Sequence, residues 1–196
     1  MGVIVAVTGA SGAVIAMRLL EVLKEKRIET HLIISESGKK VIGYELGNSD
    51  EIRSLSTFHY SEDEIDAGIA SSSNPVDAMV IAPCSLKTLS AVANGFCDNL
   101  ITRCAENMLK LNRKLVVMPR DTPLSLAAIE NMYNLKLSGA IILPPNMAYY
   151  YGPKTVDDVT DFFAGKILDA LGIEHSAYRK WVKYDEASPV IRLPGD

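Results

Sequence analysis

Apolar residues in this 196-residue chain alternate between short β-branched runs and longer stretches with helical spacing. Gly2 to Thr8 is a valine-rich run typical of a buried strand, and glycines follow it at once. From about Ser11 to Lys26, apolar residues recur every three or four positions while charged residues fill the other positions. The pattern therefore predicts that the chain begins with a strand, a tight turn and a helix.

The same alternation continues to about residue 171. Further strands are expected at 30–35, 78–82, 114–118 and 140–143, and further helices at 38–46, 85–93, 99–111, 124–135 and 156–171. Pro83 is expected to end its strand, and Ser85 is placed to cap the following helix. Strands that alternate with helices predict an α/β fold, with five or six strands in a mostly parallel sheet covered on both faces.

Periodicity is weakest between Gly47 and Ser73. The acidic run from Ser61 to Glu64 favours the start of a helix, and the segment is expected to cross the edge of the sheet. With no linker to divide the chain, residues 1–175 are expected to form one domain. Residues 176–196 are expected to form a tail, and its aromatic residues Tyr178 and Trp181 favour packing on the domain or on a neighbouring subunit.

The composition of the chain argues against several classes of binding partner. A net charge of −4 gives no general attraction to nucleic acid, so any anion site must be local. No apolar run approaches the ~18 to 20 residues that span a bilayer, so neither a membrane segment nor a membrane partner is expected. Cys84, Cys97 and Cys104 form no Cys-x-x-Cys pair, which argues against a disulfide framework and a structural zinc site. A cytoplasmic protein with reduced thiols and no bound metal is expected.

The turn Thr8-Gly9-Ala10-Ser11-Gly12 joins the first strand to the first helix. Glycines let the backbone turn tightly, and the exposed amides and the helix dipole favour a phosphate. The turn lacks the full dinucleotide fingerprint and the lysine of a triphosphate loop. Two alternatives to a phosphate site are compatible with the same residues: the turn is merely structural, or Ser11 caps its own helix.

Two further loops follow predicted strands, and the carboxyl ends of parallel strands are where such sheets bind ligands. In the segment from Pro83 to Thr88, the hydroxyls of Ser85 and Thr88 either bond a ligand or only cap a helix. In the segment from Met118 to Pro123, Arg120 suits a phosphate, and a surface pair with Asp121 is the alternative.

A proline-rich loop from Pro144 to Pro153 contains three consecutive tyrosines. These residues suit ring stacking and hydroxyl donation to a ligand, and packing at an oligomer interface is equally compatible with them. Lys166, on the last predicted helix, is either a surface charge or a second phosphate anchor. Arg103 and Lys110 of the 99–111 helix are candidate functional cations. The three histidines show no spacing typical of metal ligands and are assigned no role.

Taken together, Gly9 to Gly12, Pro83-Cys84-Ser85-x-x-Thr88, Pro119-Arg120 and Tyr150-x-x-Pro153 resemble the UbiX family of flavin prenyltransferases. The resemblance covers nearly the whole chain and is weakest between Gly47 and Ser73. It implies a homododecamer of flavodoxin-like (Rossmann-like) subunits. The implied reaction joins the dimethylallyl group of dimethylallyl phosphate to N5 and C6 of reduced FMN, and the prenylated FMN then serves UbiD-type decarboxylases.

The resemblance also implies roles for individual residues. FMN would be held by Gly9, Ala10, Ser11, Ser35, Ser85, Leu86, Lys87, Thr88 and Arg120. The prenyl phosphate would be held by Tyr150 and Lys166, with added charge from Arg103 and Lys110 of the same or a neighbouring subunit. Ser11, Glu45 and Asp121 would be catalytic, and Asp121 stands where the family commonly has the longer glutamate. A carboxylate shorter by one methylene reaches about one bond length less far towards the reacting groups.

Two other functions are associated with this type of fold. FMN-dependent cysteine decarboxylases share this type of fold but rely on a histidine near the first helix, and no histidine precedes His31 here. An FMN-binding flavoprotein without its own activity, or an accessory subunit of an aromatic acid decarboxylase, is compatible with the same residues.

Overall fold

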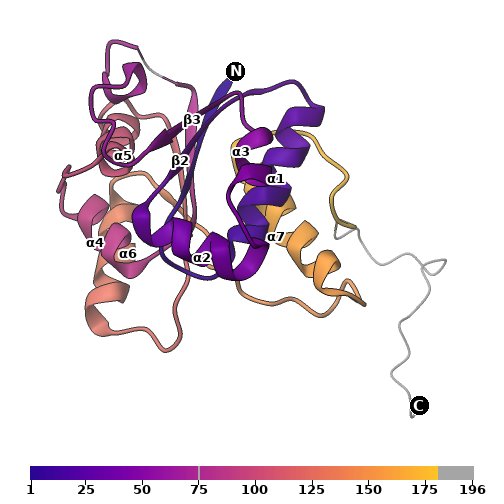
Figure 1. The fold of residues 1–196 in the computed structure, drawn as a ribbon. Coiled ribbons are helices and arrows are strands. Elements are labelled where there is room, and N and C mark those ends of the chain that lie inside the picture. Colours follow the sequence, from indigo (N-terminus) through magenta and orange to yellow (C-terminus); the bar gives the residue numbers. More distant parts are fainter. Residues whose placement is uncertain (75, 181–196) are drawn as a thin grey trace, which may run out of the picture.

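A computed structural model describes residues 1–74 and 76–180, which form a parallel sheet of six strands in the order β3-β2-β1-β4-β5-β6 (Figure 1). The strands are β1 (Gly2–Val7), β2 (Glu29–Ile34), β3 (Phe58–Ser61), β4 (Ala78–Cys84), β5 (Lys114–Pro119) and β6 (Ile141–Ile142). Every neighbouring pair is parallel. The expected α/β class is confirmed, and the strand order is that of the doubly wound Rossmann sheet.

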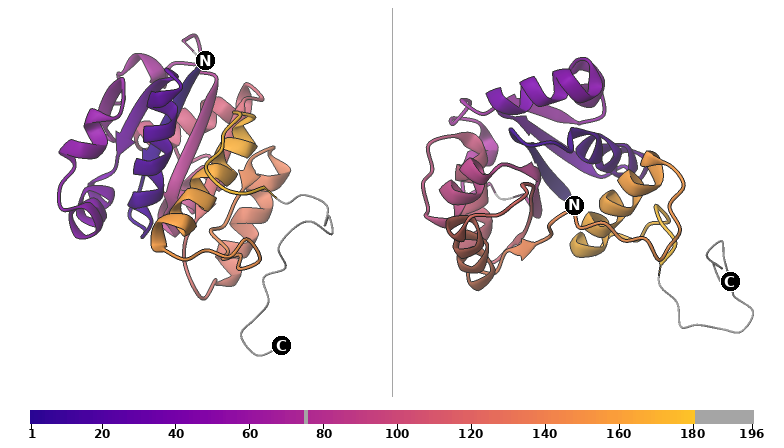
Figure 2. Two further views of the ribbon diagram at one scale, coloured as in Figure 1. Left: turned by 90° about the vertical axis from the view of Figure 1, so that its right-hand side faces the viewer. Right: turned by 90° about the horizontal axis from the view of Figure 1, so that it is seen from below.

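Helices cover both faces of this sheet (Figures 1 and 2). One layer contains α1 (Ala13–Glu25), α2 (Glu36–Leu46), α3 (Asp50–Ser54) and α7 (Val156–Leu171), and the other contains α4 (Leu86–Ala93), α5 (Leu100–Lys110) and α6 (Leu126–Leu137). A short 3-10 helix, η1 (Gly68–Ala70), precedes β4. The three-layer sandwich explains why the central strands are apolar on both faces.

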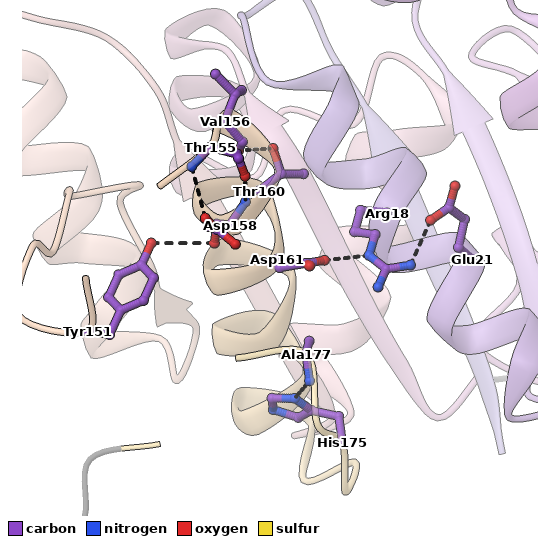
Figure 3. Close-up of polar contacts among 10 residues, drawn as sticks. All are labelled: Arg18, Glu21, Tyr151, Thr155, Val156, Asp158, Thr160, Asp161, His175 and Ala177. Atoms are coloured by element: carbon purple, nitrogen blue, oxygen red, sulfur yellow. Dashed lines mark hydrogen bonds and ion pairs between the residues drawn. The ribbon is translucent and has the colours of Figure 1, made fainter. Parts of the chain in front are cut away.

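Strand β1 illustrates how the two cores form. Val3, Val5 and Val7 belong to the core beneath α1 and α7, whereas Ile4 and Ala6 belong to the core beneath α4 and α5. Alternate residues of a strand point to opposite faces, so a continuous apolar run serves both cores at once. In the layer that covers the first of these cores, α7 packs beside α1, and Arg18 Nε donates to Asp161 at 2.5 Å (Figure 3).

The structure corrects two sequence predictions. Pro83 does not end its strand, because β4 continues to Cys84 through a cis Ala82–Pro83 peptide bond. No helix begins at Ser61, because Ser61 is the last residue of β3, an edge strand that pairs with β2. The aromatic and β-forming residues just before Ser61 favour a strand, and the acidic residues after it lie in a turn.

Other boundaries agree closely with the prediction. Helix α7 spans the predicted residues, and Ser85, Asn99 and Ser125 each cap the helix that follows them. Tyr178 lies within the described residues, whereas Trp181 and the rest of the predicted tail lie outside them. Among the described helices, none combines the length and the apolar character needed to cross a membrane.

Candidate functional site

The glycine turn after β1 and the Ser85 loop after β4 meet where the strand order reverses, between β1 and β4. The buried Thr8 joins the two strand ends: its Oγ1 donates to the Pro83 carbonyl at 2.8 Å and accepts from the Ser85 amide at 2.8 Å. In doubly wound sheets this reversal of strand order opens the ligand-binding crevice. Thr8 therefore fixes the glycine turn relative to the Ser85 loop.

The N-terminus of α1 already holds a carboxylate of the chain itself. Glu45 on α2 accepts from the Gly12 amide at 2.9 Å and from the Ala13 amide at 2.7 Å. The N-cap residue is Gly12, at φ 119°, so Ser11 does not cap this helix. A negative group at a helix N-terminus is stabilised by the dipole. Of the turn amides predicted to face a phosphate, that of Gly12 donates to Glu45 and that of Ala10 donates to the Thr8 carbonyl, while Ser11 is exposed.

The first amides of α2 also donate to side chains of the protein itself. The buried Ser35 accepts from the Gly38 amide at 2.9 Å, and the Glu36 amide donates to Glu62 at 2.7 Å. The glycine turn packs closely on this helix, because a Cβ at Gly9 would lie 2.5 Å from the Cβ of Ser37. Gly9 is thus required for the close approach of the turn to α2, whatever it contributes to a ligand.

The N-terminus of α4 is different. Ser85 Oγ accepts from the Thr88 amide at 3.3 Å and lies 3.1 Å from the Thr88 hydroxyl. The first turn carries no acidic residue and contains the exposed Lys87. The amides of Leu86 and Lys87 have no acceptor inside the helix, as in any first turn. This end of α4 combines amides, two hydroxyls and a cation, a donor set that suits an anion.

Arg120 and Asp121 lie at the end of β5, and both side chains are exposed. The Arg120 amide donates to the Cys84 carbonyl at 3.1 Å, which ties this loop to the Ser85 loop. The Asp121 carboxylate accepts from the Thr122 amide at 2.8 Å. Beside them, a cavity of about 390 Å³ extends to Pro144 and Asn146 of the next loop. Arg120 thus joins the α4 group at the same edge of the sheet.

Tyr150 and Lys166 lie on the α7 side of the molecule. The exposed Tyr150 packs edge-on against Tyr151, which stacks on Phe162 of α7 at 4.8 Å between ring centroids. Lys166 Nζ lies 3.5 Å from the hydroxyl of Tyr178. The two predicted phosphate ligands thus border one aromatic group, although they come from different elements.

Arg103 and Lys110 lie on α5, in the opposite helical layer from α7 (Figure 2). Both side chains are exposed, and Arg103 Nε donates to the Ala70 carbonyl at 3.4 Å. With the sheet between the layers, one subunit does not bring these cations to the phosphate that Lys166 would hold.

The cysteines contribute no evident nucleophile. Cys84 is fully buried, and burial raises the pKa of its thiol far above the ordinary range. Burial also raises the pKa of Cys104 to about 12. Both thiols therefore stay protonated near neutral pH, and thiolate is the nucleophilic form. Within residues 1–74 and 76–180, no group of three or more His, Cys, Asp or Glu side chains is placed to hold a metal ion.

Sequence reasoning missed the positioning roles of Thr8, Glu62 and Tyr178. Thr8 was read only as part of the turn, although a hydroxyl at the end of a central strand has a neighbouring strand within reach. Glu62 lies in the least periodic segment and carries no motif. Tyr178 lies in the predicted tail, and only its hydrogen bond to Asp169 of α7 shows where its hydroxyl points.

Comparisons with known proteins agree on one group of relatives. A family profile described as Flavoprotein matches residues 1–168. The flavin prenyltransferase UbiX of Methanocaldococcus jannaschii is 49% identical over 182 residues, which are 92% of this chain and 98% of that protein.

Two solved structures match with a TM-score of 0.91. A dodecameric FMN-dependent UbiX-like decarboxylase from Escherichia coli is 38% identical and is matched over 93% of this chain and 100% of that chain. AnUbiX, solved in complex with FMN and dimethylallyl pyrophosphate, is 35% identical and is matched over 94% of this chain and 98% of that chain.

Proposed function

The chain belongs to the flavoprotein family and, within it, to the UbiX flavin prenyltransferases, and we propose on this premise that it prenylates reduced FMN. The dimethylallyl group of dimethylallyl phosphate is transferred to N5 and C6 of the flavin. The observation that carries this proposal is the convergence of the Thr8, Ser85 and Arg120 loops at one edge of the sheet. These loops supply donors for a phosphorylated flavin without a metal or a histidine.

The FMN phosphate binds at the N-terminus of α4. Ser85, Leu86, Lys87 and Thr88 supply hydroxyls and amides there, and Arg120 adds a cation from the neighbouring loop. A phosphate at α1 would have to displace Glu45 from the Gly12 and Ala13 amides. Gly9, Ala10 and Ser11 then face the rest of the flavin, and Ser35 contributes through its position at the start of α2.

The prenyl phosphate is bound by residues of two subunits. Tyr150 and Lys166 lie on the α7 side, and Arg103 and Lys110 on the α5 side, so one dianion meets all four only where two copies of the chain touch. Cations around the leaving phosphate stabilise the charge that develops as its bond to carbon breaks. The four residues favour departure of phosphate in this way.

The chain's own groups also move protons. Bound reduced FMN supplies N5 and C6, the two atoms that form bonds to the dimethylallyl group. Glu45 lies beside the turn that carries Ser11, held by two backbone amides, and its carboxylate accepts a proton near the reacting atoms. Asp121, exposed on the Arg120 loop at the same edge of the sheet, assists the same transfers.

The subunits assemble into a homododecamer. Helix α6 exposes four large apolar side chains at helical spacing, Leu126, Ile129, Tyr133 and Leu137, which are 50–71% exposed. A contiguous apolar stripe of this kind is typical of a surface that another protein covers. A closed assembly buries the stripe, and it brings the α5 and α7 sides of different subunits together.

Prenylated FMN leaves the enzyme for a UbiD-type decarboxylase in the cytoplasm. This part of the proposal rests on the family and on the reduced cysteines. Transfer of product to such a decarboxylase, measured as decarboxylation in a reconstituted mixture, tests the recipient. Cell fractionation tests the location.

The central experiment is to incubate the purified protein with reduced FMN and dimethylallyl phosphate under anaerobic conditions and to weigh the flavin by mass spectrometry. The expected product carries one added five-carbon unit. A parallel incubation with dimethylallyl pyrophosphate decides whether the diphosphate also serves. A flavin of unchanged mass, with FMN still bound, contradicts the proposal and favours a flavin carrier or accessory subunit.

A further inference from the structure

We propose that Asp169, His175 and Tyr178 form a hydrogen-bonded support that positions Lys166 for the phosphate of the prenyl substrate. This inference rests on the proposed function, because it assigns that phosphate to Lys166. The three supporting residues are positioning residues, since none of them is placed to touch the reacting atoms. Asp169 lies in the last turn of α7, and His175 and Tyr178 lie in the segment that follows this helix.

Gly172 turns the chain back over α7. It adopts the left-handed conformation at φ 78°, and the Ile173 amide donates to the Leu168 carbonyl at 2.9 Å. Such a helix end suits glycine because a Cβ is strained there. The chain then runs along the outside of α7, where Figure 3 shows His175 and Ala177 beside the helix. The return places Tyr178 over Phe162, with ring centroids 5.0 Å apart.

Gly165 makes room for this return. The residue is buried in the middle of α7, where glycine is a poor helix former. A Cβ there would lie 2.4 Å from Tyr178 Cδ1 and 2.9 Å from His175 Cε1. The rings of Tyr178 and His175 therefore rest directly on the backbone of Gly165, one residue before Lys166. Packing against backbone fixes the two rings relative to the lysine.

Asp169 holds both rings through hydrogen bonds. His175 Nε2 donates to one carboxylate oxygen at 3.1 Å, and its Nδ1 accepts from the Ala177 amide at 3.1 Å, so the imidazole carries its proton on Nε2. The Tyr178 hydroxyl donates to the other oxygen at 2.5 Å. Burial alone would raise the pKa of Asp169, but hydrogen bonds from Lys180, Tyr178 and His175 lower it to about 2. The carboxylate is thus ionised throughout the neutral range.

The arrangement leaves Lys166 oriented but weakly held. Because Tyr178 donates its proton to Asp169, its oxygen faces Lys166 Nζ as an acceptor at 3.5 Å. The same Nζ lies 3.9 Å from Asp169, too far for a hydrogen bond, and its side chain is 44% exposed. A phosphate oxygen can replace these weak contacts at little cost. The cluster of Lys166, Lys180 and Asp169 keeps a net positive charge for the incoming dianion.

The support also lies next to the other predicted phosphate ligand. The Tyr178 ring packs on Phe162, Phe162 stacks on Tyr151, and Tyr151 packs against Tyr150. Burial, the hydrogen bond to Asp169 and the nearby Tyr150 together raise the pKa of Tyr178 above the ordinary range. Tyr178 therefore stays a neutral donor, and it links the loop that carries Tyr150 to the helix that carries Lys166.

Tyr178→Phe tests the support in the full-length protein, because it keeps the ring on Gly165 and removes only the hydroxyl. The expected result is a rise of about tenfold in KM for dimethylallyl phosphate, because the lysine side chain must then be ordered when the phosphate binds. Once bound, the phosphate itself holds Lys166, so kcat and the affinity for FMN are expected to stay unchanged. Lys166 should also react faster with an acylating reagent, followed by peptide mass spectrometry. Tyr151→Phe is the matched control, since its hydroxyl contacts the Asp158 carbonyl instead.

Gly165→Ala is the second variant, because its methyl group displaces both rings while alanine favours the helix. It should reproduce the rise in KM. An unchanged KM in both variants, or parallel losses of FMN affinity, kcat and thermal midpoint, would overturn the support. If the wild-type protein does not prenylate FMN, the proposed function fails. The acylation rate of Lys166 still tests the support, because equal rates in the wild type and in Tyr178→Phe would overturn it.

Discussion

The N-termini of α1 and α4 lie at the same edge of the sheet, on the two sides of the point where strand order reverses. Each is a helix start that follows a buried strand, and Thr8 connects the two. At α1 the Gly12 and Ala13 amides donate to Glu45. At α4 the first turn holds Ser85, Lys87 and Thr88 and no acidic residue.

The difference shows that a glycine turn at a helix start does not by itself identify an anion site. Both helix ends attract negative charge through their dipoles. At α1, the Glu45 carboxylate of α2 accepts from the first backbone amides, so this helix end holds a proposed catalytic group. The α4 end offers hydroxyls and a cation instead, which makes it the better place for a ligand phosphate.

The largest expected effect comes from Glu45→Gln, which removes the charge at α1 and keeps the side-chain shape. We expect the prenylation rate to fall about a hundredfold, a typical loss for a general base, while the FMN dissociation constant changes little. Stopped-flow assays and FMN fluorescence quenching measure the two quantities. Tighter FMN binding would contradict the comparison, because it would mean that the α1 amides had been released for the phosphate.

Thr8→Val removes the side-chain part of the connection between the two helix starts and leaves the hydrogen bond from the Thr8 amide to the Pro83 carbonyl. The amide of the half-buried Ser85 then loses its acceptor, and the Pro83 carbonyl loses one of its donors. We expect a loss of about 2 kcal/mol in the free energy of unfolding, measured by urea denaturation, together with weaker FMN binding. Thr8→Ser keeps the hydroxyl and serves as the control. Equal losses in the two variants would contradict a special role of the hydroxyl, because Thr8→Val loses the hydroxyl and keeps the methyl group, whereas Thr8→Ser loses only the methyl group.

Ser85→Ala sharpens the comparison at α4. Loss of the cap is expected to cost about 1 kcal/mol in the free energy of unfolding, and loss of a ligand contact to raise the FMN dissociation constant about tenfold. The matched control is Ser125→Ala, which removes the same kind of cap from α6. If both variants lose stability and neither loses FMN affinity, the phosphate does not bind at α4.

The smallest effect is expected at α2, the third helix start of this edge. Glu62→Gln removes a negative charge from beside the Glu36 amide and leaves one oxygen to accept from it, while the exchanged oxygen no longer accepts from Asn99 Nδ2. We expect a loss of about 0.5 kcal/mol in the free energy of unfolding, the usual size of a charge–dipole interaction, and unchanged FMN affinity. A large loss of FMN affinity would mean that α2 takes a more direct part in the site.

Much of the site could be read from the sequence because each loop follows an apolar run. Once the runs at 78–82 and 114–118 are taken as parallel strands, Ser85 and Arg120 must lie at one edge. The exact strand ends could not be predicted, since β4 continues past Pro83. Nor could the partner of Gly12, because Glu45 is 33 residues away and no local pattern links the two.

The sequence by itself determined the α/β class, the α-helices except α3 and the strands except β3, because hydrophobic periodicity and capping are local properties of the chain. Through its motifs it also determined the family resemblance. Only the tertiary structure decided which helix start is open, which layer carries each cation and which residues surround Lys166. These depend on contacts between segments far apart in sequence, and such contacts form only when the helices pack on the sheet.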